Sequence, residues 1–69
     1  MAQIGVRIKE ARKNAGLTQK QLAARIGCKQ NEIWRWECGV VRPTIKTLCR
    51  IAEALGCKPA DLMGWEDIG

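Results

Sequence analysis

The sequence contains no histidine, and it also lacks phenylalanine and tyrosine. The missing histidine removes the commonest metal ligand and the side chain that most often acts as acid or base near neutral pH. Apolar residues never follow one another for more than a few positions, whereas a transmembrane helix needs about 20. Residues 1–5 lack the charged start and apolar stretch of a secretion signal. We therefore expect a cytoplasmic protein without a membrane partner.

Arrangements of catalytic residues are missing as well. No nucleophile stands beside a base, and no carboxylates are paired at helical spacing. We expect the chain to form one domain, residues 1–69, which leaves no room for the deep cleft that most enzymes need. We expect neither enzymatic activity nor a cofactor, and no small-molecule ligand is evident.

Four cysteines, Cys28, Cys38, Cys49 and Cys57, are many for so short a chain. A disulfide framework or a zinc site are the alternatives that such a count raises. The cysteines lack the close pairing that is usual for zinc ligands, and no secretion signal points to an oxidising compartment. We expect no metal site and interpret the thiols as reduced, small apolar side chains.

Positive charge is concentrated in the first part of the chain. Residues 1–50 hold eleven Lys and Arg against three acids, whereas residues 51–69 hold one Lys against four acids. This asymmetry is typical of a protein that meets phosphate with one face. Ordinary solvated charge explains the count equally well, so charge alone leaves both interpretations open.

The pattern predicts helices separated by glycine turns, because no segment alternates apolar and polar residues as a strand does. A first helix is expected to end at Gly16. Its apolar face comprises Ile4, Ile8, Ala11 and Ala15. Thr18 and Gln21 have the spacing of a capping box, which predicts a second helix at about residues 18–26, before Gly27.

Three more helices are expected. The third, at about residues 29–38, buries Ile33 and Trp36. The fourth begins after Thr44, which is a suitable cap. Its expected apolar face comprises Ile45, Leu48, Ile51, Ala52 and Leu55. Pro59 suits the first position of a short fifth helix, at about residues 59–63, which an acidic tail, residues 64–69, follows.

The second and third helices have the size and pattern of a helix-turn-helix motif, over residues 19–38. Ala23 is small where the two helices must approach closely, and Gly27 allows a positive φ in the turn. Leu22, Ile26, Ile33 and Trp36 are placed to face the remaining core. Each feature alone is common, but their combination at these offsets predicts a DNA-binding helix pair.

The chain resembles the phage-repressor and Cro-like helix-turn-helix proteins, also called Xre-type regulators, over residues 4 to about 63. The resemblance is carried by Ile4-Gly5, Gly16-Leu17-Thr18-Gln19, Leu22-Ala23, Ile26-Gly27, Gln30, Ile33, Glu37, Gly39, Arg42-Pro43-Thr44, Leu48, Ile51-Ala52 and Ala54-Leu55-Gly56. It implies an all-α, five-helix, lambda-repressor-like DNA-binding domain. It also implies that Cys28, Cys49 and Cys57 are core positions and that Cys38 is exposed.

In this family the third helix reads bases in the major groove. The resemblance places the base-reading positions at Lys29, Gln30, Asn31 and Arg35. Gln and Asn suit adenine, and Arg and Lys suit guanine. The alternative is that these side chains form only the polar outer face of a surface helix.

Other positions are expected to contact the DNA backbone. Gln19 matches a position that contacts phosphate and often braces the first residue of the recognition helix. Thr44 begins a helix whose free amides suit phosphate, with Arg42 close by and Lys46 as a weaker candidate. Trp34 should project outward, where its N–H can donate to phosphate, although it can equally lie along its own helix.

The resemblance also makes Arg12 and Glu37 a structural salt bridge that orients the third helix. Lys29 departs from the family pattern, because the residue before this helix is usually Ser or Thr. Its positive charge opposes the helix dipole, and a nearby phosphate would relieve that.

The resemblance and the motif together predict a sequence-specific transcriptional regulator of double-stranded DNA, of the repressor type and of prokaryotic or phage origin. Two half-sites provide affinity that one small module lacks, so we expect a homodimer on a palindromic operator. Apolar residues near the tail are candidates for the dimer contact, namely Leu62, Met63, Trp65 and Ile68, although core packing of the fifth helix explains Leu62 equally well. The alternative is an antitoxin-like module that binds a protein and also regulates its own promoter.

Overall fold

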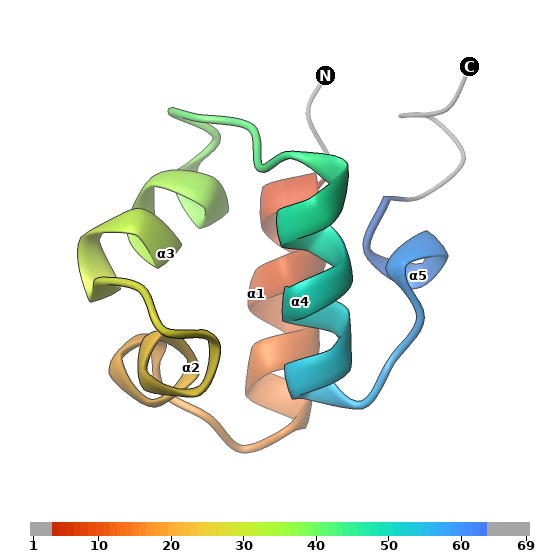
Figure 1. The fold of residues 1–69 in the computed structure, drawn as a ribbon, viewed down its shortest axis with the longest axis horizontal. Coiled ribbons are helices and arrows are strands. Elements are labelled where there is room, and N and C mark those ends of the chain that lie inside the picture. The colour runs from red at the N-terminus through yellow and green to blue at the C-terminus, as the bar shows by residue number, and fades with distance from the viewer. Residues whose placement is uncertain (1–3, 64–69) are drawn as a thin grey trace.

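The computed structural model describes residues 4–63, which contain five α-helices and no strand (Figure 1). The helices are α1 (Ile4–Asn14), α2 (Gln19–Ile26), α3 (Gln30–Cys38), α4 (Ile45–Leu55) and α5 (Pro59–Met63). In Figure 1, α1 and α4 lie in the centre, α2 and α3 lie to one side, and α5 lies to the other. The all-α fold expected from the sequence is therefore confirmed.

The start of α2 has the capping box predicted from Thr18 and Gln21. The Thr18 hydroxyl accepts a hydrogen bond from the backbone N–H of Gln21 at 3.1 Å, and the Gln21 side chain accepts from the backbone N–H of Thr18 at 2.9 Å. Two amides that would lack a partner at a helix start are thereby satisfied. The cap fixes where α2 begins, and so sets the first half of the motif.

Gly27 forms the turn between α2 and α3. Its φ of 76° is left-handed, a conformation that costs glycine no clash with a Cβ atom. The N–H groups of Gly27 and Cys28 both donate to the carbonyl of Ala23, which closes the end of α2. The chain then leaves α2 in the direction that α3 requires.

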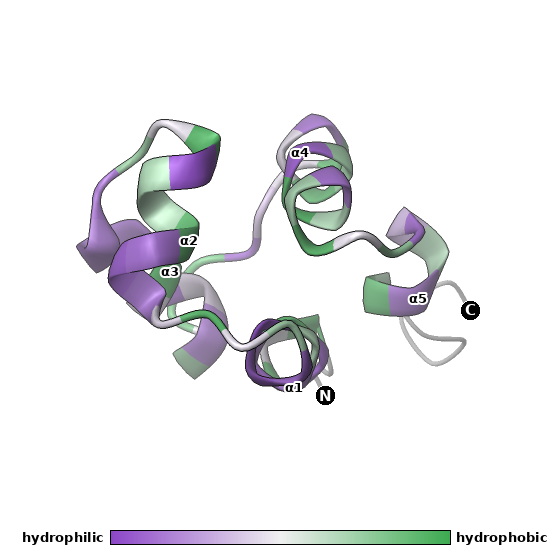
Figure 2. Ribbon diagram, turned by 90° about the horizontal axis from the view of Figure 1, so that it is seen from below, coloured by the Kyte–Doolittle hydropathy of each residue, from purple (hydrophilic) through white to green (hydrophobic). Residues whose placement is uncertain are grey.

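The core is one cluster to which every helix contributes. Its buried members are Ile4, Ile8, Leu22, Ala23, Ile26, Ile33, Leu48, Ile51, Ala52 and Leu62. Figure 2 shows hydrophobic residues of α4 on the side turned toward the other helices. Because Leu62 is only 1% exposed in this cluster, it is a core residue of α5 and is not available for a dimer contact.

Two expectations for α4 are wrong. Ile45, expected on the apolar face, is 61% exposed, because it opens the helix and a helical side chain leans toward the N-terminus, here beyond the core. Cys49, expected in the core, is exposed, because it lies about 100° around the helix from the buried Leu48. Leu55, at the other end of the expected face, is only partly buried.

Two further expectations need correction. Ala15, placed on the apolar face of the first helix, lies beyond the end of α1 and is exposed. Trp36, expected in the core, is only partly buried and packs against the core from its edge, because the indole is too large to enter beside Ile33.

The remaining cysteines divide by burial. Cys38 is exposed, whereas Cys28 and Cys57 are partly buried against the core, and all four thiols are free. Burial raises the pKa of the Cys28 thiol, with Glu32 adding to the rise, and burial with Asp61 raises the pKa of Cys57. Both thiols are therefore protonated at neutral pH and behave as packing groups.

Residues 4–63 lack the features of a membrane span and of a metal site. Those residues contain no helix that is long and apolar enough to cross a membrane. They also contain no group of His, Cys, Asp or Glu side chains that would hold a metal ion.

Candidate nucleic-acid interface

The outer side of α3 gathers the four residues expected to read bases. Lys29 precedes the helix, and Gln30, Asn31 and Arg35 belong to it, and all four are exposed. Ile33 points the other way and is completely buried. One side of α3 is thus fixed by the core while the other presents amide and cationic groups to solvent.

The positive charges at this face are not paired with acids in the part of the chain that the structure describes. Among residues 4–63, neither Lys29 nor Arg35 has an acidic partner at ion-pair distance. At the start of α3 the Glu32 carboxylate accepts from the backbone N–H of Lys29 at 3.2 Å, and the Lys29 side chain makes no capping bond. Lys29 therefore holds its charge at the positive end of the helix dipole, where an anion would be stabilised.

Glu37, at the other end of α3, receives hydrogen bonds from two helices. Arg12 of α1 binds it twice, with Nε to Oε2 at 2.6 Å and Nη2 to Oε1 at 3.1 Å. Gln19 of α2 donates its Nε2 to Oε1 at 3.0 Å. The ion pair is almost fully buried, with side chains 9% and 3% exposed. This network ties α3 to both of its neighbours and fixes the direction of the helix.

Gln19 also reaches the first residue of α3. Its Oε1 lies 3.5 Å from Nε2 of Gln30, a long contact. Because its own amide nitrogen is held by Glu37, the acceptor oxygen is the part of Gln19 that faces Gln30. The link from Glu37 to Gln19 was not predicted from the sequence, since nothing in the spacing of these residues indicates it.

The start of α4 supplies a second group of polar atoms. The Thr44 hydroxyl accepts from the backbone N–H of Thr47 at 3.2 Å and donates to the Thr47 hydroxyl at 2.9 Å. The first amides of the helix have no acceptor within it. Lys46 and Arg42 are exposed on either side of Thr44, whereas Pro43 is buried and holds the connection in place.

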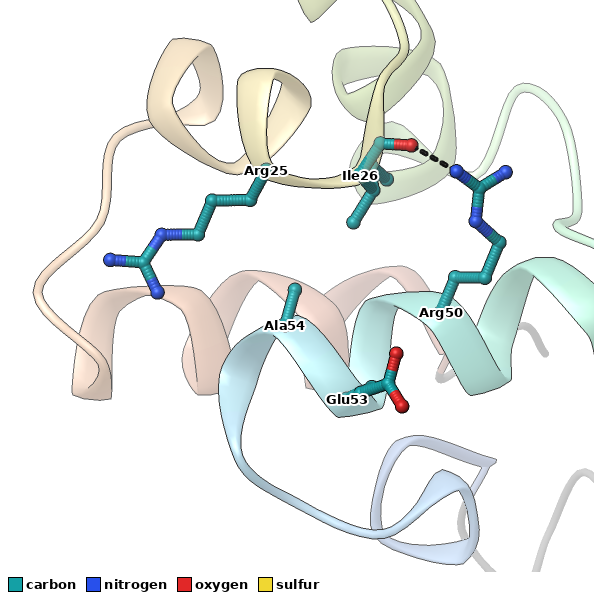
Figure 3. Close-up of a pocket in the computed structure, with 5 residues that line it drawn as sticks. All are labelled: Arg25, Ile26, Arg50, Glu53 and Ala54. Carbon is teal, nitrogen blue, oxygen red and sulfur yellow. Dashed lines mark hydrogen bonds between the residues drawn. The ribbon is translucent and has the colours of Figure 1, made fainter.

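A hollow between α2 and α4 is lined by Arg25, Ile26, Arg50, Glu53 and Ala54 (Figure 3). Arg50 donates to the carbonyl of Ile26, the last residue of α2. A guanidinium at a helix C-terminus satisfies an otherwise unpaired carbonyl. Its positive charge also interacts favourably with the negative end of the helix dipole. Arg50 therefore stabilises the turn before α3, a role that sequence reasoning missed.

The comparisons with known proteins agree with this geometry. A helix-turn-helix family model matches residues 8–62. The chain is 38% identical over 65 residues to the HTH-type transcriptional regulator DicA of Escherichia coli, covering 93% of this chain and 48% of DicA. It is 45% identical over 49 residues to an HTH-type transcriptional regulator of Methanothermobacter thermautotrophicus, covering 71% of each.

A eukaryotic relative is similar as well. The chain is 38% identical over 55 residues to multiprotein-bridging factor 1 of Candida albicans, covering 80% of this chain and 36% of that protein. The chain spans less than half the length of this relative and of DicA. The family match and the residues it spans show that the chain belongs to the Cro-like, Xre-type helix-turn-helix family, whose members include DNA-binding transcriptional regulators.

Proposed function

We propose that this protein binds double-stranded DNA sequence-specifically, with α3 in the major groove. The observation that carries the proposal is the exposed face of α3, where two cations that have no acidic partner among the described residues lie beside two amide side chains. Gln30 and Asn31 suit adenine, and Lys29 and Arg35 suit guanine. The buried network around Glu37 supports the proposal, because base recognition requires a helix held in one direction.

We propose that backbone contacts flank this face. The helix starts at Gln19 and Thr44 offer amides to phosphate, and Arg42 and Lys46 add positive charge beside the second of these. Such contacts set the position of the protein on the duplex and do not carry sequence information. Trp34, also expected among these contacts, is exposed on α3.

We further propose that the protein is a cytoplasmic repressor that binds a palindromic operator as a homodimer. One small module contacts too few base pairs for high specificity, and a second copy doubles the contacts. Leu62 was expected in the dimer contact but lies in the core. Among the described residues, this leaves Met63 from the expected contact, and its side chain is partly buried. Trp65 and Ile68, also expected there, and the acidic tail lie outside the described residues.

Selection from a random DNA library tests base reading. The wild-type protein should enrich a palindromic site, and the Gln30→Ala, Arg35→Ala double variant should lose its preference for that site by at least about 30-fold, since each bidentate base contact contributes about 1–3 kcal/mol. The variant should keep weak, salt-dependent binding through phosphate contacts. Lys58→Ala, which removes one charge beside α5, is the matched control and should select the wild-type site. An unchanged preference in the double variant would overturn this assignment.

A protein-binding role is the second candidate. The similarity to a protein named multiprotein-bridging factor 1 favours it, as do Val40 and Val41, which are 62% and 44% exposed after α3. An antitoxin that also regulates its own promoter belongs to this class. Failure to enrich any DNA site, together with recovery of a stoichiometric protein partner, would favour this candidate.

A further inference from the structure

Trp34 is a large apolar side chain on the outer face of α3, where it is 47% exposed. We propose that Trp34 is a specificity-determining residue that recognises thymine through its C5-methyl group. The inference rests on the proposed function, because it requires α3 to lie in the major groove. It changes the expected role of Trp34 from a backbone contact to a base contact.

The position of Trp34 around the helix carries the inference. At about 100° per residue, Trp34 lies about 40° from Gln30 and about 60° from Asn31. Trp34 therefore lies between Gln30 and Asn31 around the axis, on the same exposed side of α3. Gln30 and Asn31 are proposed to read bases, so a side chain that lies between them faces the same base edges. Trp34 is therefore directed toward base edges.

The size of the side chain fits this position. A recognition helix of this kind contacts bases with its N-terminal residues, so a residue one turn further along is further from the groove floor. The indole is the largest side chain and can span that gap where a short polar group cannot.

The chemistry of the indole selects the base feature. Thymine is the base whose major-groove edge carries a methyl group, and apolar side chains recognise it by contact. About half of the Trp34 side chain is open to solvent in the free protein, so apolar surface is available to be covered. Its neighbours Gln30 and Asn31 provide hydrogen bonds, whereas Trp34 provides an apolar contact that they lack.

Uracil substitution tests the inference, because uracil lacks only the methyl group. In the site selected by the wild-type protein, each thymine is replaced in turn and the Kd is measured. At one or more positions the wild-type Kd should rise about fourfold, the loss expected when one apolar carbon is no longer buried. Trp34→Ala should bind the thymine and uracil versions of that position equally. The fold of the variant is checked by circular dichroism.

Trp34→Phe separates a base contact from a phosphate contact. Phenylalanine keeps an aromatic face but has no N–H, so it should retain sensitivity to uracil. If Phe and Ala both weaken binding by the same factor at every sequence, Trp34 donates to phosphate and the inference is wrong. An equal effect of uracil on the Kd of wild type and of Trp34→Ala would also overturn the inference. If Gln30→Ala still reduced the preference for the selected site, the proposed function would stand. Absence of any selected site would instead refute the proposed function, and this inference with it.

Discussion

Replacing Gly5 with alanine should destabilise the fold by about 2 kcal/mol or more, although alanine favours a helix by about 1 kcal/mol. A Cβ atom at this position would lie 2.5 Å from the carbonyl oxygen of Trp36 and 2.6 Å from that of Glu37. Both atoms belong to the backbone of α3, so no side-chain rotation relieves the clash. The two helices must move apart, and α3 then loses its fixed direction.

Urea unfolding measures this effect, and DNA affinity should fall with it because α3 carries the proposed contacts. Val6→Ala is the matched control, since Val6 is the next residue of α1 and is 50% exposed. Its free energy of unfolding should stay within about 0.5 kcal/mol of the wild type. Equal stability of Gly5→Ala and wild type would show that α1 and α3 do not approach as closely as described.

Removing the Glu37 carboxylate, as in Glu37→Ala, should cost about 3–5 kcal/mol of stability. Arg12 is only 8% exposed, and without Glu37 its guanidinium retains one described acceptor, the carbonyl of Leu17 at 2.8 Å. A buried charge without a counter-ion is strongly unfavourable. The Nε2 group of Gln19 also loses its acceptor, so Gln30, which contacts Gln19 Oε1, is less well positioned.

The Arg12→Met, Glu37→Met double variant separates stability from recognition. Replacing both partners by apolar groups of similar size leaves no uncompensated charge, so the double variant should be more stable than Glu37→Ala. It should still discriminate less well between DNA sites, because Gln19 is no longer held. Additive losses of stability from Arg12→Met and Glu37→Met, measured by urea unfolding, would contradict a coupled pair.

Local signals made the helices predictable. Thr18, Thr44 and Pro59 mark helix starts, and Gly27 marks the end of α2, because caps and positive φ depend on a few neighbouring residues. The helical period likewise identified Ile8, Leu48 and Ile51 as core residues, and all are buried.

The errors arose where position along the chain does not fix burial. Ile45 has the right spacing for the apolar face, but it lies at the start of α4, where the helix extends beyond the core. Cys49 was assigned to the core from the family pattern, although its position around the helix turns it away from the core and toward solvent. Trp36 lies on the side of α3 that faces the core, as expected, but the size of the indole limits how far it is buried.

The site was predictable as a set of exposed residues on one helix, because exposure follows the same period as the core. Among the contacts that position the site, the Arg12–Glu37 salt bridge was implied by the family resemblance, whereas two hydrogen bonds were not predicted. Gln19 and Glu37 are 18 residues apart, and Arg50 and Ile26 are 24 apart. Such contacts depend on how α2, α3 and α4 pack, and neither pair has a spacing that reveals it.

Methylation interference on the selected DNA site tests the central claim most directly. Guanine N7 lies in the major groove, and adenine N3 lies in the minor groove. If α3 reads bases as proposed, methylation at N7 within each half-site should prevent binding, and methylation at N3 in the same half-site should leave binding intact. Interference from N3 methylation alone would contradict the account, because it would place the protein in the minor groove.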